Sequence, residues 1–359
     1  ADCFQYAREW AEAERAYREA LNILDGKGVR GLSVVHILVN LGHLYEVTDR
    51  HAKAIPMLHR AMELFRSAGR IEEAGYAAVL VNLGRCRQRL GDFESAEQLY
   101  QEAAEVKAGL FPDGHPARAT TEVQLARLYL ARGALSEAED RANAAVVALR
   151  EAGHHKHRYM AHALHVLGEV YRATGQLQRA RVAFRQVLEP ESQISGGAPA
   201  PALAALANVY VDLGEYAKAN QAYTEVVRRL ESSPQGGLSY SNAISNHAVV
   251  HVCMEKNITA MEMLDESVRI WEQHANDLFA VSGERDRLRY VASGRSRVEM
   301  MISLLVHRVS GSGQGRQRAL EVLLRLQGMV VGSITEEMQV VRRSKDPELN
   351  RLVLSMVNA

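Results

Sequence analysis

The sequence predicts an all-α protein in which pairs of helices stack into a solenoid. Three observations predict it: small residues recur at a nearly constant interval, glycines follow them at a fixed distance, and apolar residues repeat at helical spacing. Alanines that mark the second helix of each pair stand 39 to 42 residues apart. They are Ala13, Ala54, Ala96, Ala138, Ala180, Ala219 and Ala260. A period this regular indicates seven copies of one helical unit.

Each copy is expected to contain two antiparallel helices in close contact. On the first helix a small and a large apolar residue lie one turn apart, as Gly168 and Tyr171 do. A glycine then ends that helix in the left-handed region, which glycine adopts at little cost. These glycines are Gly91, Gly133, Gly175 and Gly214. The second-helix alanines allow close approach, and Tyr100, Phe184 and Tyr223 fill the space behind them.

The clearest copies are "NLGRCRQRLGDFESAEQLYQEA", "QLARLYLARGALSEAEDRANAA", "VLGEVYRATGQLQRARVAFRQV" and "ALANVYVDLGEYAKANQAYTEV". They resemble the tetratricopeptide repeat, and the long period is similar to that of the kinesin-light-chain variety. The resemblance covers residues 1–275 and implies a right-handed superhelical solenoid with about six complete repeats after a truncated first one. Counting back from Ala13 places most of the first helix of that repeat before residue 1. We therefore expect the chain to be a fragment of a longer protein.

The segment "FPDGHP" at 111–116 falls between the second helix of one copy and the first helix of the next. Proline stops one helix and begins another, so this segment is expected to separate two helices. His115 is accordingly interpreted as part of a helix boundary and not as a catalytic residue.

Composition and charge exclude several classes of function. The 43 basic and 43 acidic residues give a formal net charge of zero, which predicts no bulk attraction to nucleic acid or anionic lipid. Cys3, Cys86 and Cys253 are far apart and predict neither a disulfide framework nor a zinc site, which suits a reducing cytoplasm. We find no apolar run of membrane-spanning length and no signal peptide. We expect a cytoplasmic protein with no membrane partner, no cofactor and no direct small-molecule substrate.

The period stops near residue 276, and 276–359 predict long amphipathic helices. "SGERDRL" at 282–288, "MISLLVHRVS" at 301–310 and "ALEVLLRLQGMV" at 319–330 resemble, in order and spacing, a helical adaptor. This adaptor is found in proteins that join tetratricopeptide repeats to a CHAT domain, a caspase-like cysteine peptidase module. Leu326-Gln327 departs from the family, where Arg-Lys is more usual. The resemblance implies the regulatory region of a larger protease of bacterial defence, and some relatives of this layout attach to RNA-guided effector complexes.

The chain itself is not expected to be an enzyme. The His-Gly and Ser-Ala-Cys steps of such a peptidase are missing from the sequence, and Cys86 and Cys253 fall on first helices as packed apolar residues. The catalytic histidine and cysteine of a parent protease would follow Ala359. Two alternatives stay open. The solenoid could be the sensor arm of a signalling ATPase with its nucleotide-binding domain before Ala1, or a stand-alone scaffold.

Two groups of histidines invite a metal interpretation. The segment "GHHKHRYMAHALH" contains His154, His155, His157, His162 and His165, and a second pair is His247 and His251. Neither group has a carboxylate or cysteine at a usual ligand spacing. We interpret the first as a polar loop that runs into a helix of the concave surface, and we predict no metal.

A candidate binding surface follows from the register of the first helices. In this family the residues two before and one after the small Gly or Ala line the concave face. These positions are held by Asn40, His43, Asn82, Arg85, Gln124 and Arg127, and later by Val166, Glu169, Ala205, Asn208, Asn246 and Val249. Carboxamides in register can hold an extended backbone of any sequence. Arg85, Arg89 and Arg127 favour an acidic segment or a chain carboxylate. We therefore expect a protein or peptide partner, acidic in part.

Overall fold

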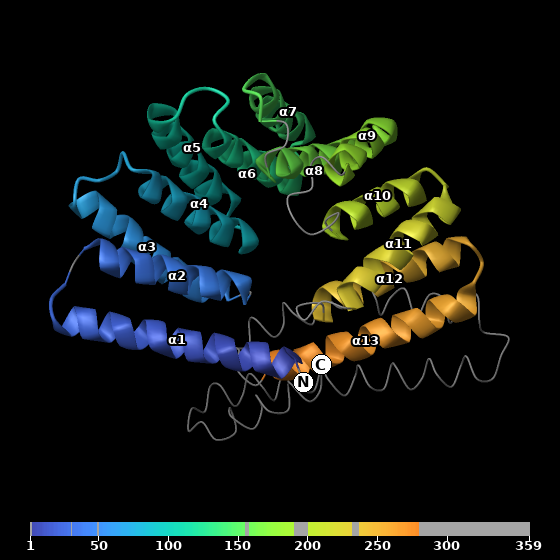
Figure 1. Cartoon of the computed structure of the whole chain (residues 1–359), viewed down its shortest axis with the longest axis horizontal. Helices are drawn as coiled ribbons and strands as arrows, with labels where there is room; N and C mark the ends of the chain where they lie inside the picture. Colours follow the sequence, from blue (N-terminus) through green and yellow to red (C-terminus); the bar gives the residue numbers. More distant parts are fainter. Residues whose placement is uncertain are drawn as a thin grey trace, which may run out of the picture. The chain divides into compact units, whose positions relative to one another are not determined.

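The computed structural model describes residues 2–29, 31–48, 50–154, 158–189, 200–231 and 237–279, and these residues are helical apart from short connections (Figure 1). They form thirteen helices and no strand within these ranges, which confirms the all-α class. The helices are α1 (Asp2–Gly26), α2 (Leu32–Val47), α3 (His51–Ser67), α4 (Ala74–Arg89), α5 (Phe93–Leu110), α6 (Pro116–Arg132), α7 (Leu135–Glu151), α8 (Arg158–Ala173), α9 (Leu177–Leu188), α10 (Ala200–Asp212), α11 (Tyr216–Glu231), α12 (Gly237–Cys253) and α13 (Asn257–Phe279).

The helices belong to two compact units, residues 1–236 with α1 to α11 and residues 237–359 with α12 and α13. In the first unit α1 is the second helix of the truncated repeat, and α2–α3, α4–α5, α6–α7, α8–α9 and α10–α11 are repeat pairs that pack together. First helices of consecutive pairs also contact each other: α2 with α4, α4 with α6, α6 with α8, and α8 with α10. The first helices of this unit therefore form one continuous layer.

The alanine register is confirmed by burial. Ala54, Ala96, Ala138, Ala180, Ala219 and Ala260 are all 0% exposed, and Ala13 is half-buried against the core that α2 and α3 contribute to. The facing small residue on each first helix is as tightly enclosed. A Cβ added to Gly84 would lie 2.6 Å from the Tyr100 ring, and one added to Gly168 would lie 2.7 Å from Phe184. The two helices of a pair approach this closely because glycine has no side chain there.

The glycines that end the first helices adopt the predicted left-handed backbone, with φ of 83° at Gly91, 77° at Gly133, 75° at Gly175 and 73° at Gly214. The same register position in the α12–α13 pair holds Glu255, which is forced to a φ of 61°. This is the one described residue other than glycine with a positive φ. A side chain is sterically disfavoured in the left-handed region, so the turn between α12 and α13 is strained at Glu255.

The segment at 111–116 is a helix boundary, as predicted. His115 is the N-cap of α6, and its Nδ1 accepts a hydrogen bond from the backbone N–H of Ala117 at 3.1 Å. Its ring stacks on Phe111 with centroids 4.4 Å apart, and Pro116 opens the helix. A Cβ at Gly114 would lie 2.8 Å from the carbonyl oxygen of Ala148 in α7, so this loop also packs closely on the following repeat. The imidazole of His115 thus caps the N-terminus of α6.

Polar side chains join consecutive repeats in a recurring arrangement. Tyr129 donates a hydrogen bond to Glu97 Oε1 at 2.6 Å, and Arg132 donates to Glu97 Oε2 at 2.6 Å. One acidic residue of α5 therefore receives two donors from α6. Tyr45 and Arg50 donate to the two carboxylate oxygens of Glu14 in the same way, at 2.9 and 2.7 Å. Each glutamate directly follows a second-helix alanine, so the repeat period places these contacts.

Cys86 and Cys253 differ in exposure, and the predicted domain boundary falls within a helix. Cys86 is 0% exposed, and burial raises the pKa of its thiol to about 12, as expected of a packed apolar residue. Cys253 is exposed, so the expectation that it packs in the core is wrong. It lies five residues after Ala248, and the exposed Arg89 and Asp212 hold this position in other repeats. The boundary that we predict at 275/276 falls inside α13, and 280–359 lie outside the described residues, so the adaptor stays a prediction.

Candidate peptide-binding groove

The structure places the predicted binding residues on the layer of first helices, from α2 to α10, and on α12 of the second unit. All ten reach the surface: Asn40, His43, Arg89, Arg127 and Asn246 are exposed, and Asn82, Arg85, Gln124, Glu169 and Asn208 are half-buried. Val166 is 1% exposed, so the expectation that it lines the surface is wrong. The Val166 side chain is buried among its neighbours, whereas the carboxamides at this position remain accessible to a partner.

Arg85 is held by an acidic residue that the sequence analysis missed. Its Nη2 donates to Glu46 Oε2 on α2 and to Asn82 Oδ1 on α4, both at 2.8 Å. His43 Nδ1 lies 3.7 Å from the same Glu46 oxygen. Glu46 stands four residues after Gly42, one helical turn beyond the predicted position His43. This spacing places Glu46 on the same face of α2 and is the sequence feature that points to it. The charge of Arg85 is thus balanced within the chain.

Arg89 and Arg127 differ from Arg85 because both are exposed and neither forms an ion pair with any residue that the structure describes. The positive charge of Arg127 still acts on its surroundings: burial and then Arg127 lower the pKa of His162, and Arg127 adds to the effect of His165 in lowering the pKa of Glu169 on α8. These two arginines are the cations of the predicted set that are available to a partner.

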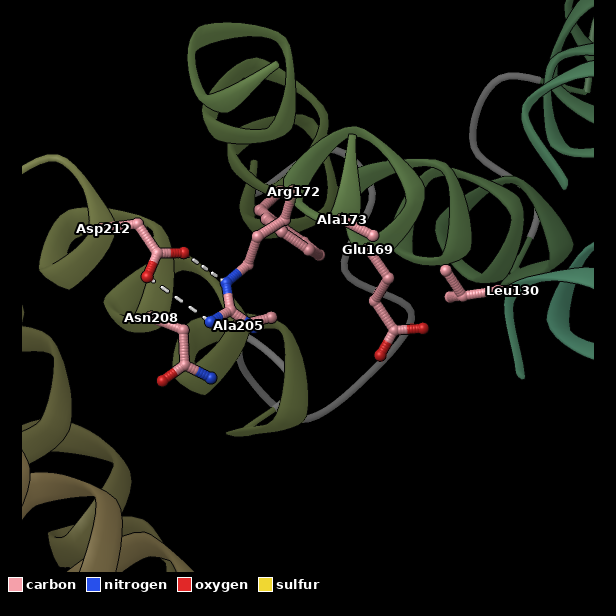
Figure 2. Close-up of a pocket in the computed structure, with 8 residues that line it drawn as sticks. Leu130, Glu169, Arg172, Ala173, Ala205, Asn208 and Asp212 are labelled. Carbon is pink, nitrogen blue, oxygen red and sulfur yellow. Dashed lines mark hydrogen bonds and ion pairs between the residues drawn. The ribbon is translucent and has the colours of Figure 1, made fainter. Parts of the chain in front are cut away.

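A pocket of about 440 Å³ opens in the first unit between α6, α8, α9 and α10. It is lined by Leu130, Glu169, Arg172, Ala173, Phe184, Ala205, Asn208 and Asp212 (Figure 2). The pocket brings together three residues at predicted positions, Glu169 on α8 and Ala205 and Asn208 on the neighbouring first helix α10. Leu130, Arg172 and Asp212 were not predicted. They lie four or five residues after the small residue of their helix, in the same register as Glu46 and Arg89.

Charges in the pocket are arranged unevenly. Arg172 Nε donates to Asp212 Oδ2 at 2.5 Å and thereby links α8 to α10. Asn208 Oδ1 accepts a hydrogen bond from the hydroxyl of Tyr223. Burial acts to raise the pKa of Glu169, but the hydrogen bond with His165 and the charges of His165, Arg127 and Arg172 outweigh it, so the pKa is lowered. The Glu169 carboxylate is therefore ionised at neutral pH.

The histidine groups can be located in part. His165 Nε2 lies 3.5 Å from Glu169 Oε1, whereas His155 and His157 lie outside the described residues. His247 and His251 have ring centroids 4.8 Å apart on α12, and burial, with the charge of His251, lowers the pKa of His247 to about 4. Across the described ranges, no group of three or more histidine, cysteine, aspartate or glutamate side chains could hold a metal ion. No described helix is long and apolar enough to cross a membrane.

Comparison with known proteins identifies the repeat. One tetratricopeptide repeat model matches residues 33–109, 75–151 and 117–189, and a second matches residues 202–236. Together these matches cover more than half of the chain. The chain belongs to the tetratricopeptide repeat family. The described helices form a protein-interaction scaffold, because tetratricopeptide repeats generally bind protein partners.

Solved structures share this fold at low sequence identity. BtubC (BKLC) from P. vanneervenii is 18% identical, with 62% of this chain and 92% of that chain covered and a TM-score of 0.51. A chain of the APC/C hetero-tetramer Cut9-Hcn1 is 16% identical, with 72% and 43% covered and a TM-score of 0.54. A putative kinesin light chain from Podosopora anserina is 23% identical, with 58% and 99% covered and a TM-score of 0.46. No curated protein matches the chain significantly. The BtubC and Cut9-Hcn1 structures bear on the fold alone.

Proposed function

We propose that this tetratricopeptide repeat chain binds an extended, partly acidic segment of a protein partner along α2, α4 and α6. The observation that supports it most is the row of carboxamides Asn40, Asn82 and Gln124, one on each of three successive first helices that contact each other. A carboxamide can both donate to and accept from a peptide backbone. A row in register therefore suits an extended chain, whose peptide groups also recur at regular spacing.

The contact of Asn82 with Arg85 prepares this surface. Arg85 Nη2 donates to Asn82 Oδ1 at 2.8 Å, which orients the carboxamide. The NH₂ group of Asn82 is then available to donate to a backbone carbonyl of the partner. Arg89 and Arg127 lie on α4 and α6 and provide the positive charge for acidic side chains or a chain carboxylate.

Charge reversal at the free arginines tests this proposal. The partner segments are selected first, from a display library of random twelve-residue peptides, and are then measured by fluorescence anisotropy. Arg127→Glu and Arg89→Glu should each weaken an acidic peptide by about 1 to 3 kcal/mol per lost charge-assisted contact. Arg150→Glu is the matched control, since Arg150 is an exposed arginine at the end of a second helix, α7.

Unchanged binding by Arg127→Glu and Arg89→Glu, with the helical circular dichroism signal retained, would overturn the groove assignment. Equal weakening by Arg150→Glu would show that the total charge of the chain governs binding and would also count against the groove. Arg85 is a poorer test site, because a glutamate there would face Glu46 and disturb the contact between α2 and α4.

The scaffold is further proposed to be the recognition arm of a larger CHAT-type protease in a cytoplasmic setting. The support is sequence resemblance: three segments at 282–288, 301–310 and 319–330 occur in the order and spacing of the helical adaptor of that family. In this arrangement the solenoid would bind the partner segment, and the adaptor would pass the effect of binding to the peptidase. An RNA-guided effector complex is a partner that the resemblance implies.

A cysteine-directed active-site probe on the full-length parent, read by mass spectrometry, tests the protease proposal. We expect labelling at a cysteine beyond residue 359, with Cys86 unlabelled because its thiol is buried. A parent without a labelled cysteine beyond that point would overturn the proposal. A phosphate-binding loop before residue 1 would then favour the sensor arm of an ATPase, and its absence a stand-alone scaffold.

A further inference from the structure

We propose that the pocket between α6, α8 and α10 binds a cationic side chain, arginine or lysine, of the partner segment. This inference rests on the proposed function, because it assigns one residue of the segment that lies along the first helices. Acidic residues of the partner segment would then lie at Arg89 and Arg127, and a basic residue of the same segment would lie in the pocket. Such an arrangement would fix the direction in which the segment binds.

The size and walls of the pocket suit a long side chain. Its volume of about 440 Å³ lies in the range of sites that enclose a ligand group. Leu130, Ala173, Ala205 and Phe184 provide apolar walls from four helices. Lysine and arginine place their aliphatic stems against apolar surface while the charged head reaches a polar group. The charged end of the guest must therefore be recognised by the polar residues of the lining.

The charges of the lining favour a cation. The lining contains two carboxylates, Glu169 and Asp212, and one guanidinium, Arg172, which is already bound to Asp212 through Nε at 2.5 Å and Nη2 at 3.5 Å. Figure 2 shows the Glu169 carboxylate extending from α8 beside this pair and not into it. Glu169 lies within ion-pair distance of His165 and of no lysine or arginine among the described residues, and its side chain is 38% exposed. It is the carboxylate that remains available to a guest.

An acidic guest fits less well. A further carboxylate would face Glu169 and Asp212, while Arg172 would have to leave Asp212 to meet it. Arg127 on α6 contributes positive charge near Glu169, but it is exposed and outside the lining, where it suits the acidic part of the segment. Asn208 adds a donor. Its Oδ1 is engaged by Tyr223, so its NH₂ group can donate to a main-chain carbonyl of the guest.

A capped amino acid tests the pocket separately from the groove. N-acetyl-arginine methylamide carries one charge, the guanidinium, and the citrulline analogue is its neutral isostere. Both are titrated into the full chain with ¹³C-labelled methyl groups, and the methyl signals of Leu130, Ala173 and Ala205 report occupancy of the pocket. The methyl signals of Leu58, which is 0% exposed in another repeat, serve as the internal control.

We expect the arginine compound to shift the three pocket signals saturably and the citrulline compound to bind at least fivefold more weakly. Glu169→Gln, which keeps the shape of the side chain, should weaken the arginine compound by a similar factor. Arg150→Glu should not weaken it. Equal binding of the two compounds to the wild-type chain would overturn the proposal even if Glu169→Gln failed to fold.

The proposal would also be overturned by the absence of a saturable shift, by unchanged binding to a folded Glu169→Gln chain, or by tighter binding of N-acetyl-glutamate methylamide. These outcomes are independent of the acidic peptides selected for α2, α4 and α6. A pocket that failed this test would leave the carboxamide row intact. A chain that bound the arginine compound but selected no acidic peptide would disprove the groove and leave a cation pocket.

Discussion

The contact between α2 and α4 and the contact between α8 and α10 each hold one arginine, yet they leave different charges at the surface. Between α2 and α4, Arg85 meets Glu46 and the two charges cancel. Between α8 and α10, Arg172 meets Asp212, and a second carboxylate, Glu169, remains. The α2–α4 contact thus holds one balanced pair, whereas the α8–α10 contact holds a balanced pair and one further acid.

At a third contact, between α5 and α6, a buried lysine is bound by hydroxyl groups in place of a carboxylate. Lys107 is 8% exposed, and its Nζ donates to the hydroxyls of Thr120 and Thr121, both at 2.8 Å. No carboxylate among the described residues lies within ion-pair distance of it. Acids four or five residues after the small residue of a first helix, such as Glu46 and Asp212, therefore determine whether Arg85 and Arg172 are balanced.

The largest expected effect is the pH dependence caused by Lys107. Burial lowers its pKa to about 8, whereas lysine in an unfolded chain titrates near 10.4, so the unfolded state binds more protons between these pH values. The free energy of unfolding should therefore rise by about 2 to 3 kcal/mol across this window, relative to Lys107→Met. Urea unfolding at a series of pH values measures the rise. Lys53→Met, at an exposed position of α3, should keep the wild-type slope, and an equal slope in all three proteins would contradict this account.

The next effect tests whether the two contrasted regions share one scaffold. Gly84→Ala would bring a Cβ to 2.6 Å from Tyr100, and Gly168→Ala would bring one to 2.7 Å from Phe184. Each substitution should lower the free energy of unfolding by about 1 to 3 kcal/mol, because a fully buried aromatic ring must shift. Gly109→Ala is the control. A Cβ there meets no atom within 4 Å, so alanine within α5 should stabilise by about 0.5 to 1 kcal/mol. A loss at one of the two glycines alone would show that the close approach is not general.

The sequence predicts the scaffold well because one residue type is sufficient at each scaffold position. Ala96 and Ala138 must be small wherever two helices meet closely, and Gly133 must tolerate a positive φ. His115 could be placed at a helix boundary because Pro116 follows it. These requirements concern residues that are close together in the chain or that recur in each repeat, so they can be recognised from the sequence alone.

The charges of the surface could be predicted less fully because they depend on pairs. Arg85 and Glu46 are 39 residues apart on different helices, and register places each on the surface without showing that their side chains meet. The pocket requires four helices at once. Cys253 and Val166 show the same limit, since the register suggests a face while the neighbouring side chains decide burial.

A smaller effect compares the two units through their helix ends. Glu255 adopts a φ of 61° where Gly214 has 73°. Glu255→Gly should stabilise the α12–α13 pair by about 1 kcal/mol, since a side chain in the left-handed region costs roughly 1 to 2 kcal/mol and glycine loses part of this gain in entropy. Gly214→Ala is the reverse change and should destabilise by a similar amount, as no atom crowds its Cβ. Hydrogen exchange of the amides in α12 and α11 measures the two effects, and stabilisation by both substitutions would refute the assignment of strain.

The smallest expected effect returns to the α2–α4 and α8–α10 contacts. Glu46→Gln removes the acid that balances Arg85, so the α2–α4 region should gain a free cation and bind acidic peptides about two- to fivefold more tightly. Stability should change by less than about 1 kcal/mol, because the Arg85 side chain is 34% exposed and solvent screens the pair. Glu169→Gln is the matched change at the other contact and should strengthen acidic peptides less, because Glu169 lies on α8 near Arg127 and outside the α2–α4 contact. If both variants strengthened acidic peptides equally, the surface would respond to total charge, and the location of each acid would cease to matter.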